Sequence, residues 1–188
     1  METNKMIPFP DKKYNIIYAD PPWDIKMISR IVRPTQLDMP YKTMKLDEIK
    51  SMPVRELADD NGCHIFLWTT HKWLPKAFEV LQSWGFKYHC LLTWDKTYGF
   101  CPFSFMFSTE FCLYGQLPGK WMRPKRIGLR SLIKEKPTKH SKKPSKMRDL
   151  IVEFCGDIPR IELFARPPKD RLFEDESFKG WDVWGNEV

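Results

Sequence analysis

The sequence predicts an α/β fold in which a mainly parallel β-sheet is covered by helices on both faces. Short apolar runs rich in β-branched and aromatic residues recur along the chain, and each has the length of a buried strand. Segments with helical character alternate with these runs, which is typical of β–α–β units. The 188 residues suffice for one domain with its own core and are too few for two. We therefore treat residues 1–188 as a single domain.

Five segments are predicted to be strands. The first is an apolar run that ends at the acid of Asp20-Pro21-Pro22. The others combine aromatic and aliphatic residues over lengths too short for a helix. The predicted strands are residues 14–19, 64–68, 86–94, 110–114 and 160–165.

Three segments are predicted to be helical. Residues 46–58 contain Pro53, which must kink the helix or open a second one. Residues 72–84 are amphipathic and end before a glycine. Residues 145–154 begin at Ser145, a candidate N-cap. Loops are expected in the stretches without periodicity, at 28–41 and at about 115–144.

Positive charge is concentrated in one part of the chain. The net charge is +7, yet the segment 120–148 alone holds twelve Lys and Arg against one acid, and the remainder holds 19 basic and 23 acidic residues. Clustered cations displace counterions from phosphates, so this basic segment predicts a nucleic-acid surface. A solvated loop without a partner is the alternative. The candidate phosphate contacts are Lys120, Arg123, Lys125, Arg126 and Arg130.

Cysteine and histidine usage points to reduced thiols and to a site without metal. The five cysteines are odd in number and none forms a C-x-x-C pair, which argues against a disulfide framework and a zinc ribbon. The four histidines are scattered without ligand spacing. Residues 1–10 lack a secretory apolar run and no stretch is long enough to span a bilayer. We expect a cytoplasmic protein with no membrane partner.

The most specific motif is Asp20-Pro21-Pro22-Trp23, directly after the first predicted strand. Ligands of open α/β sheets bind at the carboxyl ends of strands. An adenine N6 amine is a poor nucleophile because its lone pair is delocalised, and it needs acceptors for its hydrogens. The Asp20 carboxylate and the Pro21 carbonyl are such acceptors, and the two prolines fix φ and remove competing donors. Trp23 offers a face to an extruded base. The alternative is a strand-ending turn with an exposed acid.

These motifs resemble the MT-A70 family of adenine N6-methyltransferases. The similarity runs in family order from Tyr14 to the end of the chain, and the ordered sum is more specific than any one motif. The matching segments are 20–27, 41–44, 46–49, 66–70, 84–86, 92–94, Lys96, 108–110, 140–144, 161–166 and 180–187.

The resemblance implies a Rossmann-like class I methyltransferase with permuted motifs, the catalytic motif being N-terminal and part of the cofactor site C-terminal. It implies S-adenosylmethionine as cofactor, with Asp20 near both the target amine and the methionine end. Trp23, Tyr41 and Glu110 become candidates for contacts to the base. The other cofactor contacts implied by the resemblance are Lys143, Arg166, Asn186 and Glu187.

One segment departs from the family pattern. Residues 98–107 are aromatic, where many family members have glycines and an arginine. In the family this region contributes to contacts with substrate or partner. We therefore carry over the chemistry and not the target sequence or the partner geometry.

The first hypothesis is a compact DNA adenine N6-methyltransferase of bacterial or phage type, acting in the cytoplasm of a bacterial or infected cell, alone, as a homodimer or with a heteromeric methyltransferase partner. The second is the same reaction on RNA. The third is a catalytically silent nucleic-acid-binding subunit, against which the intact Asp20-Pro-Pro-Trp23 motif, Lys143 and Asn186 speak.

Overall fold

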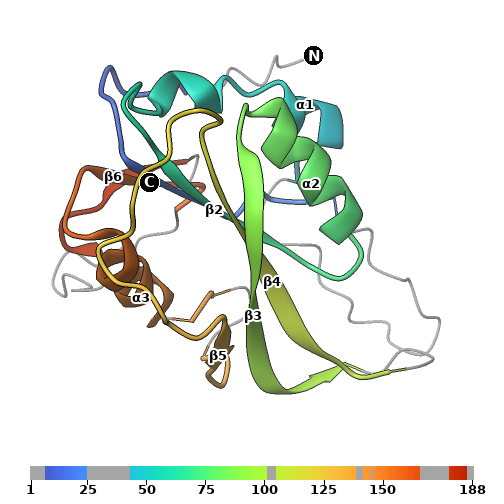
Figure 1. Cartoon of the computed structure of the whole chain (residues 1–188). Helices are drawn as coiled ribbons and strands as arrows, with labels where there is room; N and C mark the ends of the chain where they lie inside the picture. The colour runs from blue at the N-terminus through green and yellow to red at the C-terminus, as the bar shows by residue number, and fades with distance from the viewer. Residues whose placement is uncertain are drawn as a thin grey trace, which may run out of the picture.

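A computed structural model provides the structure of the chain. It describes residues 7–24, 43–100, 105–138, 142–144, 146–165 and 178–185. These residues form one layered α/β arrangement around a twisted central sheet (Figure 1). The predicted fold class is confirmed.

The described residues form a sheet of seven strands in the order β5-β3-β4-β2-β1-β6-β7. The central strands β1 and β2 are buried along their whole length, as expected for parallel strands covered on both faces. The strands are β1 Ile16–Ala19, β2 His64–Thr69, β3 Lys87–Phe100, β4 Phe107–Gln116, β5 Leu132–Lys134, β6 Arg160–Leu163 and β7 Asp182–Trp184.

Most neighbouring strands run parallel, and β4 is the exception. It pairs antiparallel with both β2 and β3, whereas β1 pairs in parallel with β2 and β6. Phe111 in β4 lies opposite Thr69, the last residue of β2. The first half of β4 therefore lies at the edge of the sheet where β1 and β2 end, which we call the carboxyl edge.

Helices cover both faces of the sheet, and Pro53 separates two short ones as the sequence predicted. On one side lie α1 and α2, and on the other lies α3 (Figure 1). The helices are α1 Leu46–Lys50, the 3₁₀ helix η1 Val54–Leu57, α2 Leu74–Ser83 and α3 Lys146–Cys155. No helix in the described ranges is long and apolar enough to cross a membrane.

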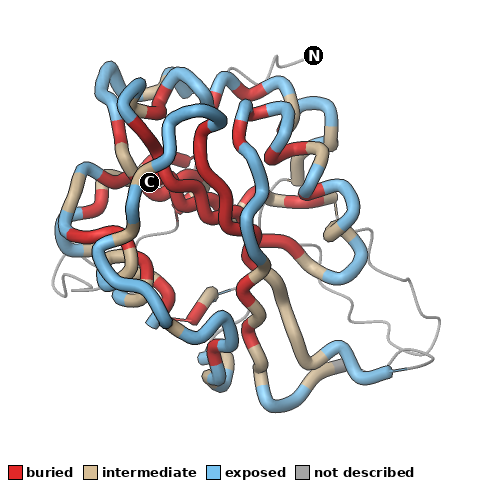
Figure 2. Tube along the Cα trace, viewed as in Figure 1, coloured by how far each residue is buried: buried red, intermediate tan, exposed pale blue. Residues whose placement is uncertain are grey.

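Two hydrophobic cores lie against the two faces of the sheet. The first packs α1, η1 and α2 onto one face through residues such as Trp84, whose indole N–H donates to the Ile49 carbonyl at 2.8 Å. The second packs Met147 and Ile151 of α3 onto Phe66 of β2. Figure 2 shows the buried residues concentrated in the strands between these layers. The sheet is thus rigidly held along its middle.

The sequence missed two strands and made both β3 and β4 too short. The segment 115–144, predicted as loop, contains β5, and the C-terminal tail contains β7. Strand β3 continues past residue 94 to Phe100. It forms with β4 a hairpin that extends beyond the last residue of β2. The described side chains near its tip are exposed and apolar, including Tyr98, Phe105 and Met106.

Candidate active site

Asp20 lies at the carboxyl edge, directly after β1. Its backbone N–H lies 3.4 Å from the Leu163 carbonyl at the end of β6. This contact places the acid between the ends of two parallel strands, where the sequence predicted a ligand site. The Asp20 side chain is partly exposed, so it can reach a ligand.

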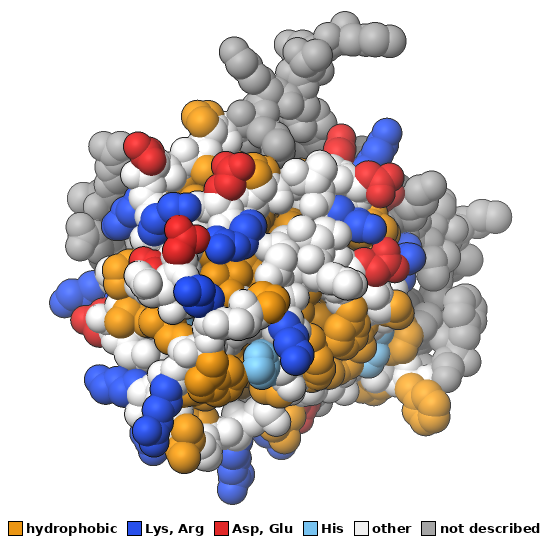
Figure 3. All heavy atoms as spheres, turned by 45° about the horizontal axis from the view of Figure 1, so that its top comes forward, with side chains coloured by type: hydrophobic (Ala, Val, Ile, Leu, Met, Phe, Trp, Pro, Cys, Tyr) orange, Lys and Arg blue, Asp and Glu red, His pale blue; other side chains and the backbone are white. Residues whose placement is uncertain are grey.

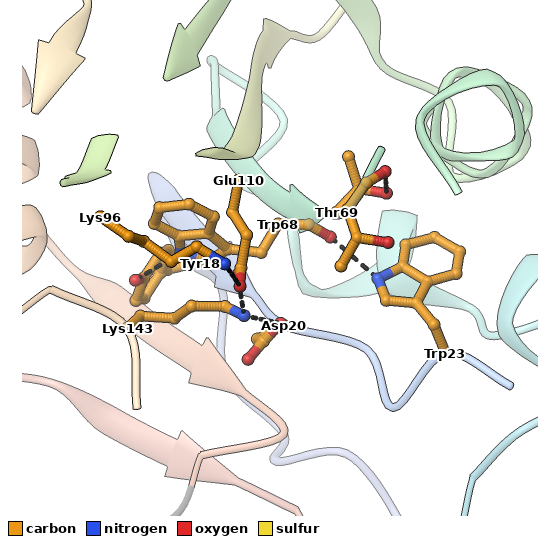
Figure 4. Close-up of polar contacts among 9 residues, drawn as sticks. Tyr18, Asp20, Trp23, Trp68, Thr69, Lys96, Glu110 and Lys143 are labelled. Atoms are coloured by element: carbon orange, nitrogen blue, oxygen red, sulfur yellow. Dashed lines mark hydrogen bonds and ion pairs between the residues drawn. The ribbon is translucent and has the colours of Figure 1, made fainter. Parts of the chain in front are cut away.

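Lys143 joins Asp20 to Glu110. Its Nζ atom lies 3.2 Å from Oδ1 of Asp20 and 3.0 Å from Oε2 of Glu110 (Figure 4). The side chain is 18% exposed and its ammonium group lies 5.4 Å from the centroid of the Trp68 ring. Segments more than a hundred residues apart in the sequence therefore meet at one ammonium group.

Glu110 is brought to this point by the direction of β4. It lies in the first half of that strand and pairs with Trp94 of β3. Lys96, two residues after Trp94 on the same strand, donates to Oε1 of Glu110 at 3.2 Å. The carboxylate of Glu110 is thus held between two lysines, one on each oxygen. We call Asp20, Lys143, Glu110 and Lys96 the charge cluster.

Glu110 and Lys143 are both ionised around neutral pH, because each pKa is shifted in favour of the charged form. Burial alone would lower the pKa of Lys143, but the charges of Asp20 and Glu110 outweigh it and raise that pKa above its ordinary value. Burial alone would raise the pKa of Glu110, but Lys143 and Lys96 outweigh it and lower that pKa. The cluster combines two acids with two bases, so it can exchange partners with a zwitterionic ligand without leaving a charge unpaired.

Trp23 lies in the core and not on the surface. It is 3% exposed, its indole N–H donates to the Trp68 carbonyl at 3.0 Å, and its ring stacks on Trp73. Figure 4 shows the indole turned toward the end of β2, away from Lys143. The face predicted to receive a base is therefore not accessible in this arrangement. We assign Trp23 instead to anchoring the turn that positions Asp20.

The carbonyls of the two prolines have different partners. The Pro21 carbonyl accepts from the backbone N–H of Trp23 at 2.8 Å, and the Pro22 carbonyl accepts from Met44 N–H at 2.9 Å. A carbonyl oxygen has two lone pairs, so Pro21 retains one for a ligand. The bond to Met44 belongs to a parallel bridge between Trp23 and Met44. The Pro-Pro turn is thus held from both sides.

Sequence reasoning missed the part played by Lys96. The signal was present, because side chains alternate along a strand and Lys96 follows Trp94 by two. Trp68 was likewise unassigned, although its carbonyl holds Trp23 and its ring lies under Lys143. Both residues act through neighbours that the sequence had singled out.

Four predicted site residues lie outside the described residues: Tyr41, Arg166, Asn186 and Glu187. Their assignments stay predictions, as does the role of Ser145 as a helix cap. Within the described ranges, no group of three or more His, Cys, Asp or Glu side chains converges as metal ligands would.

The predicted phosphate contacts are exposed, but most lie away from the charge cluster. Gln116, the last residue of β4, pairs with His64 at the start of β2, and its side chain holds the backbone of Met122. Residues 120–126 therefore continue at the opposite edge of the sheet, which we call the amino edge. Arg126 there forms an ion pair with Glu153 near the end of α3. The predicted contacts are Lys120, Arg123, Lys125, Arg126 and Arg130.

Arg130 lies elsewhere along the same segment. It comes just before β5, and Leu132 at the start of β5 pairs with Thr93 of β3, away from the amino edge. The basic segment is thus a path between the two edges and not one patch. One of its lysines, Lys143, belongs to the charge cluster itself.

Comparison with known proteins identifies the family. The MT-A70 family model matches residues 14–187, nearly the whole chain. The chain belongs to the MT-A70 family. The charge cluster and the Asp20 turn are therefore features of an MT-A70 domain, and the match covers all of them.

The relatives of this MT-A70 chain fall into two groups. It is 32% identical over 196 residues to the type II methyltransferase M.MunI of Mycoplasma sp, covering 95% of this chain and 79% of that protein. It is 29% identical to a probable N(6)-adenosine-methyltransferase of Oryza sativa and 27% identical to the N(6)-adenosine-methyltransferase catalytic subunit of Homo sapiens. Those matches cover 94% and 82% of this chain but only 23% and 26% of the relatives.

Family membership makes the chain a methyltransferase, which implies a methyl donor. An ammonium group and a carboxylate 3.2 Å apart at the carboxyl edge suit a donor that carries an amino-acid group. The described side chains at this edge supply charge pairing and hydrogen-bond acceptors. Chemically, the site can bind a zwitterion and orient an amine.

Proposed function

We propose that this chain is an S-adenosylmethionine-dependent methyltransferase that methylates the N6 amine of adenine in DNA. The observation that supports it most is the position of Asp20, at a strand end of an MT-A70 domain and paired with Lys143. The N6 position is supported by the names of the plant and human relatives. DNA is supported by the likeness to a compact type II methyltransferase.

The charge cluster fits the proposed cofactor. S-adenosylmethionine supplies a methyl group on a sulfonium centre, and its methionine end carries an ammonium and a carboxylate. Lys143 would bind the carboxylate and Asp20 would accept from the ammonium, since the two side chains already present complementary charges. Lys96 keeps Glu110 paired when Lys143 turns to a ligand. The predicted contacts of Arg166, Asn186 and Glu187 to the adenosine part belong to the same proposal.

On the substrate side, Asp20 and the Pro21 carbonyl would accept the two hydrogens of the adenine amine. Pro21 retains a lone pair for this purpose. Acceptors on both hydrogens favour a pyramidal nitrogen and so release its lone pair for attack on the methyl group. The proton that N6 loses can pass to the Asp20 carboxylate. The contribution of the chain is alignment and desolvation, with Glu110 as a further acceptor for the base.

RNA is the second candidate polymer. The plant and human relatives are named N(6)-adenosine-methyltransferases, and the family match in this chain spans the whole charge cluster. The third candidate, a silent subunit, would retain nucleic-acid binding without turnover. These candidates differ in measurable products.

The test is methylation of matched oligonucleotides by the purified chain. DNA and RNA of the same sequence are incubated with deuterium-labelled S-adenosylmethionine, digested and analysed by mass spectrometry for N6-methyladenine. We expect labelled N6-methyladenine in DNA. Product in RNA alone would reverse the polymer assignment. No product together with no cofactor binding in isothermal titration would identify a silent subunit.

A further inference from the structure

One tryptophan differs from the other seven. Trp121 is 62% exposed, whereas the remaining tryptophans, all within the described ranges, are buried or half-buried. An exposed indole leaves a large flat apolar surface in water, which is typical of a contact site. Trp121 belongs to the basic segment, on the amino edge, away from the charge cluster.

The backbone beside Trp121 is held firmly. Gln116 is fully buried, and its side-chain amide accepts from the Met122 N–H at 2.8 Å and donates to the Met122 carbonyl at 3.1 Å. On the other side, Lys120 N–H donates to the Leu117 carbonyl at 3.3 Å. The indole is therefore presented by an ordered turn.

His89 lies beside Trp121 because β3 is irregular there. The register against β4 shifts between Tyr88 and Cys90, which leaves His89 as an extra residue without a partner residue in β4. Gly115 of β4, which pairs with Tyr88, lets β3 and β4 approach each other closely. A Cβ atom on Gly115 would lie 2.6 Å from the Lys87 carbonyl oxygen. The ring centroids of His89 and Trp121 are 5.0 Å apart. Two aromatic rings thus lie next to each other at the surface.

The His89 ring is neutral at pH 7. Partial burial and, after it, the charge of Lys87 lower the pKa of His89 below its ordinary value of 6.5. A neutral imidazole beside an indole extends the flat aromatic surface without adding a charge. The cationic character of this surface therefore comes from Lys and Arg alone.

Three cations lie next to the aromatic pair in the chain or in the sheet. Lys87 pairs with Gln116 across the strands, and Lys120 and Arg123 flank the tryptophan in the chain. No described carboxylate lies within ion-pair distance of Lys87, Lys120 or Arg123, and all three are exposed. In the lower half of Figure 3, Lys and Arg side chains lie among hydrophobic ones and a histidine, with few acids between them. We call Trp121, His89, Lys87, Lys120 and Arg123 the Trp121 surface.

We propose that the Trp121 surface binds a single-stranded stretch of the nucleic-acid substrate, with a base stacked on Trp121 and phosphates on the surrounding cations. Bases stack on protein aromatics when they are unpaired, whereas in a duplex their faces are covered by neighbouring bases. Exposed rings interleaved with cations are therefore a surface for single strands. The inference rests on the proposed function, because the bound strand is the one that carries the target adenine.

The distance between the Trp121 surface and the charge cluster sets the length that the bound nucleic-acid strand must have. Strand β2 runs from the amino edge to the carboxyl edge, from His64 to Thr69. Five steps of about 3.3 Å give a span of about 17 Å. At about 3.4 Å per stacked nucleotide this is roughly five nucleotides. A strand must extend at least that far beyond the target adenine to reach both sites.

The binding test uses fluorescein-labelled 16-mers followed by anisotropy: single-stranded DNA, single-stranded RNA of the same sequence, and the DNA duplex. Trp121→Ala is expected to weaken binding of the single strands by about 5- to 150-fold, the equivalent of one stacked base. Trp121→Phe should retain most of the affinity. The matched control is Ile127→Ala, because Ile127 is 74% exposed in the same segment and is not aromatic. It should bind like the parent.

Methylation kinetics separate this inference from the proposed function. Trp121→Ala should raise KM for a 16-mer with a central adenine, leave kcat unchanged, and leave a 5-mer unaffected. If its binding to all 16-mers stays within twofold of the parent, the surface serves another partner and the inference is overturned. An equal loss on duplex and single strand also overturns it, because it indicates backbone contacts. If the parent methylates no oligonucleotide while the Trp121 effect on binding remains, the proposed function fails and the surface stands.

Discussion

The two edges of the sheet carry polar networks of different kinds. At the carboxyl edge, Asp20, Lys143 and Glu110 form charged pairs on partly exposed side chains. At the amino edge, the neutral groups of His64 and Gln116 are fully buried and both contact the hydroxyl of Tyr114. One network offers charges that a ligand can reach, and the other is buried away from solvent.

This difference gives the two edges of the sheet different roles. Ion pairs that are partly solvated can exchange partners at small cost, since water stabilises each charge during the exchange. A buried neutral network is costly to break because each lost partner leaves a polar group without water. The carboxyl edge is thus suited to binding and turnover. The amino edge forms a fixed frame that holds exposed groups such as Trp121 in place.

The largest effect is expected from Asp20→Ala at the carboxyl edge. Loss of the acceptor for the amine should reduce methyl transfer by about 10²- to 10⁴-fold, and cofactor affinity should fall by a smaller factor, because Asp20 also accepts from the ammonium group of the cofactor. Measurement of kcat/KM and of the cofactor Kd by isothermal titration checks this. Asp24→Asn, a change at a nearby acid outside the charge cluster, is the control. An Asp20→Ala enzyme with the parent rate would refute the assignment.

A smaller effect is expected from Lys143→Met, which removes the cation shared by Asp20 and Glu110. Cofactor affinity should fall by about 10- to 150-fold, the range for a hydrogen bond to a charged group. The pKa of Glu110 should rise, because Lys96 alone then opposes the effect of burial. The acid limb of the pH–rate profile should therefore move to higher pH.

The shifted pKa values of Glu110 and Lys143 also make the folding stability of the parent protein depend on pH. The pKa of Glu110 is depressed, so its stabilising contribution is present above pH 4.5 and is lost as pH falls through the lower folded value. The pKa of Lys143 is raised, so its contribution is present below pH 10.5 and is lost as pH rises through the higher folded value. Between these limits the parent should show no pH dependence from these two groups. Lys143→Arg keeps the charge and should leave the acid limb unmoved.

The smallest effect is expected at the amino edge, where His64 makes folding stability depend on pH. Burial, and then the charge of His89, lower the pKa of His64 from 6.5 to about 4. The unfolded chain therefore takes up a proton more readily than the folded chain between these values. Stability should fall by roughly 2 kcal/mol between pH 7 and pH 5.

Urea unfolding of the parent and of His64→Phe at the two pH values measures that loss. The variant retains a ring to pack on Tyr114 and Phe154 and lacks the titrating group. Its stability should change less between pH 7 and pH 5 than that of the parent. Equal pH dependence in the two proteins would assign the effect to other groups.

The sequence predicted the parts of the site that local rules govern. A buried strand followed by an acid placed Asp20 at the edge of a parallel sheet, and the structure has it there. The helix break at Pro53 and the amphipathic helix that ends before Gly85 also follow from short-range chemistry. Lys143 came from the family resemblance, because a single lysine in a basic run has no local signature.

The remainder depended on tertiary pairing. Strands β5 and β7 have three residues each, too few for a periodic pattern, and they exist because β3 and β6 pair with them. The position of Trp23 was missed because an aromatic residue after Pro-Pro looks the same in sequence whether it is buried or exposed. The basic segment was read as one patch because charge along the chain does not reveal which edge each residue reaches.

Because β4 runs antiparallel to β3, the two strands form a hairpin whose length can change without moving Glu110. Glu110 is fixed by its pairing with Trp94 below the hairpin tip, so pairs of residues added or removed between β3 and β4 leave that register intact. The chemistry of the cluster and the reach of the hairpin can therefore change independently in evolution. The hairpin can in this way become longer or shorter and reach different neighbouring molecules, while Glu110 of β4 keeps its position.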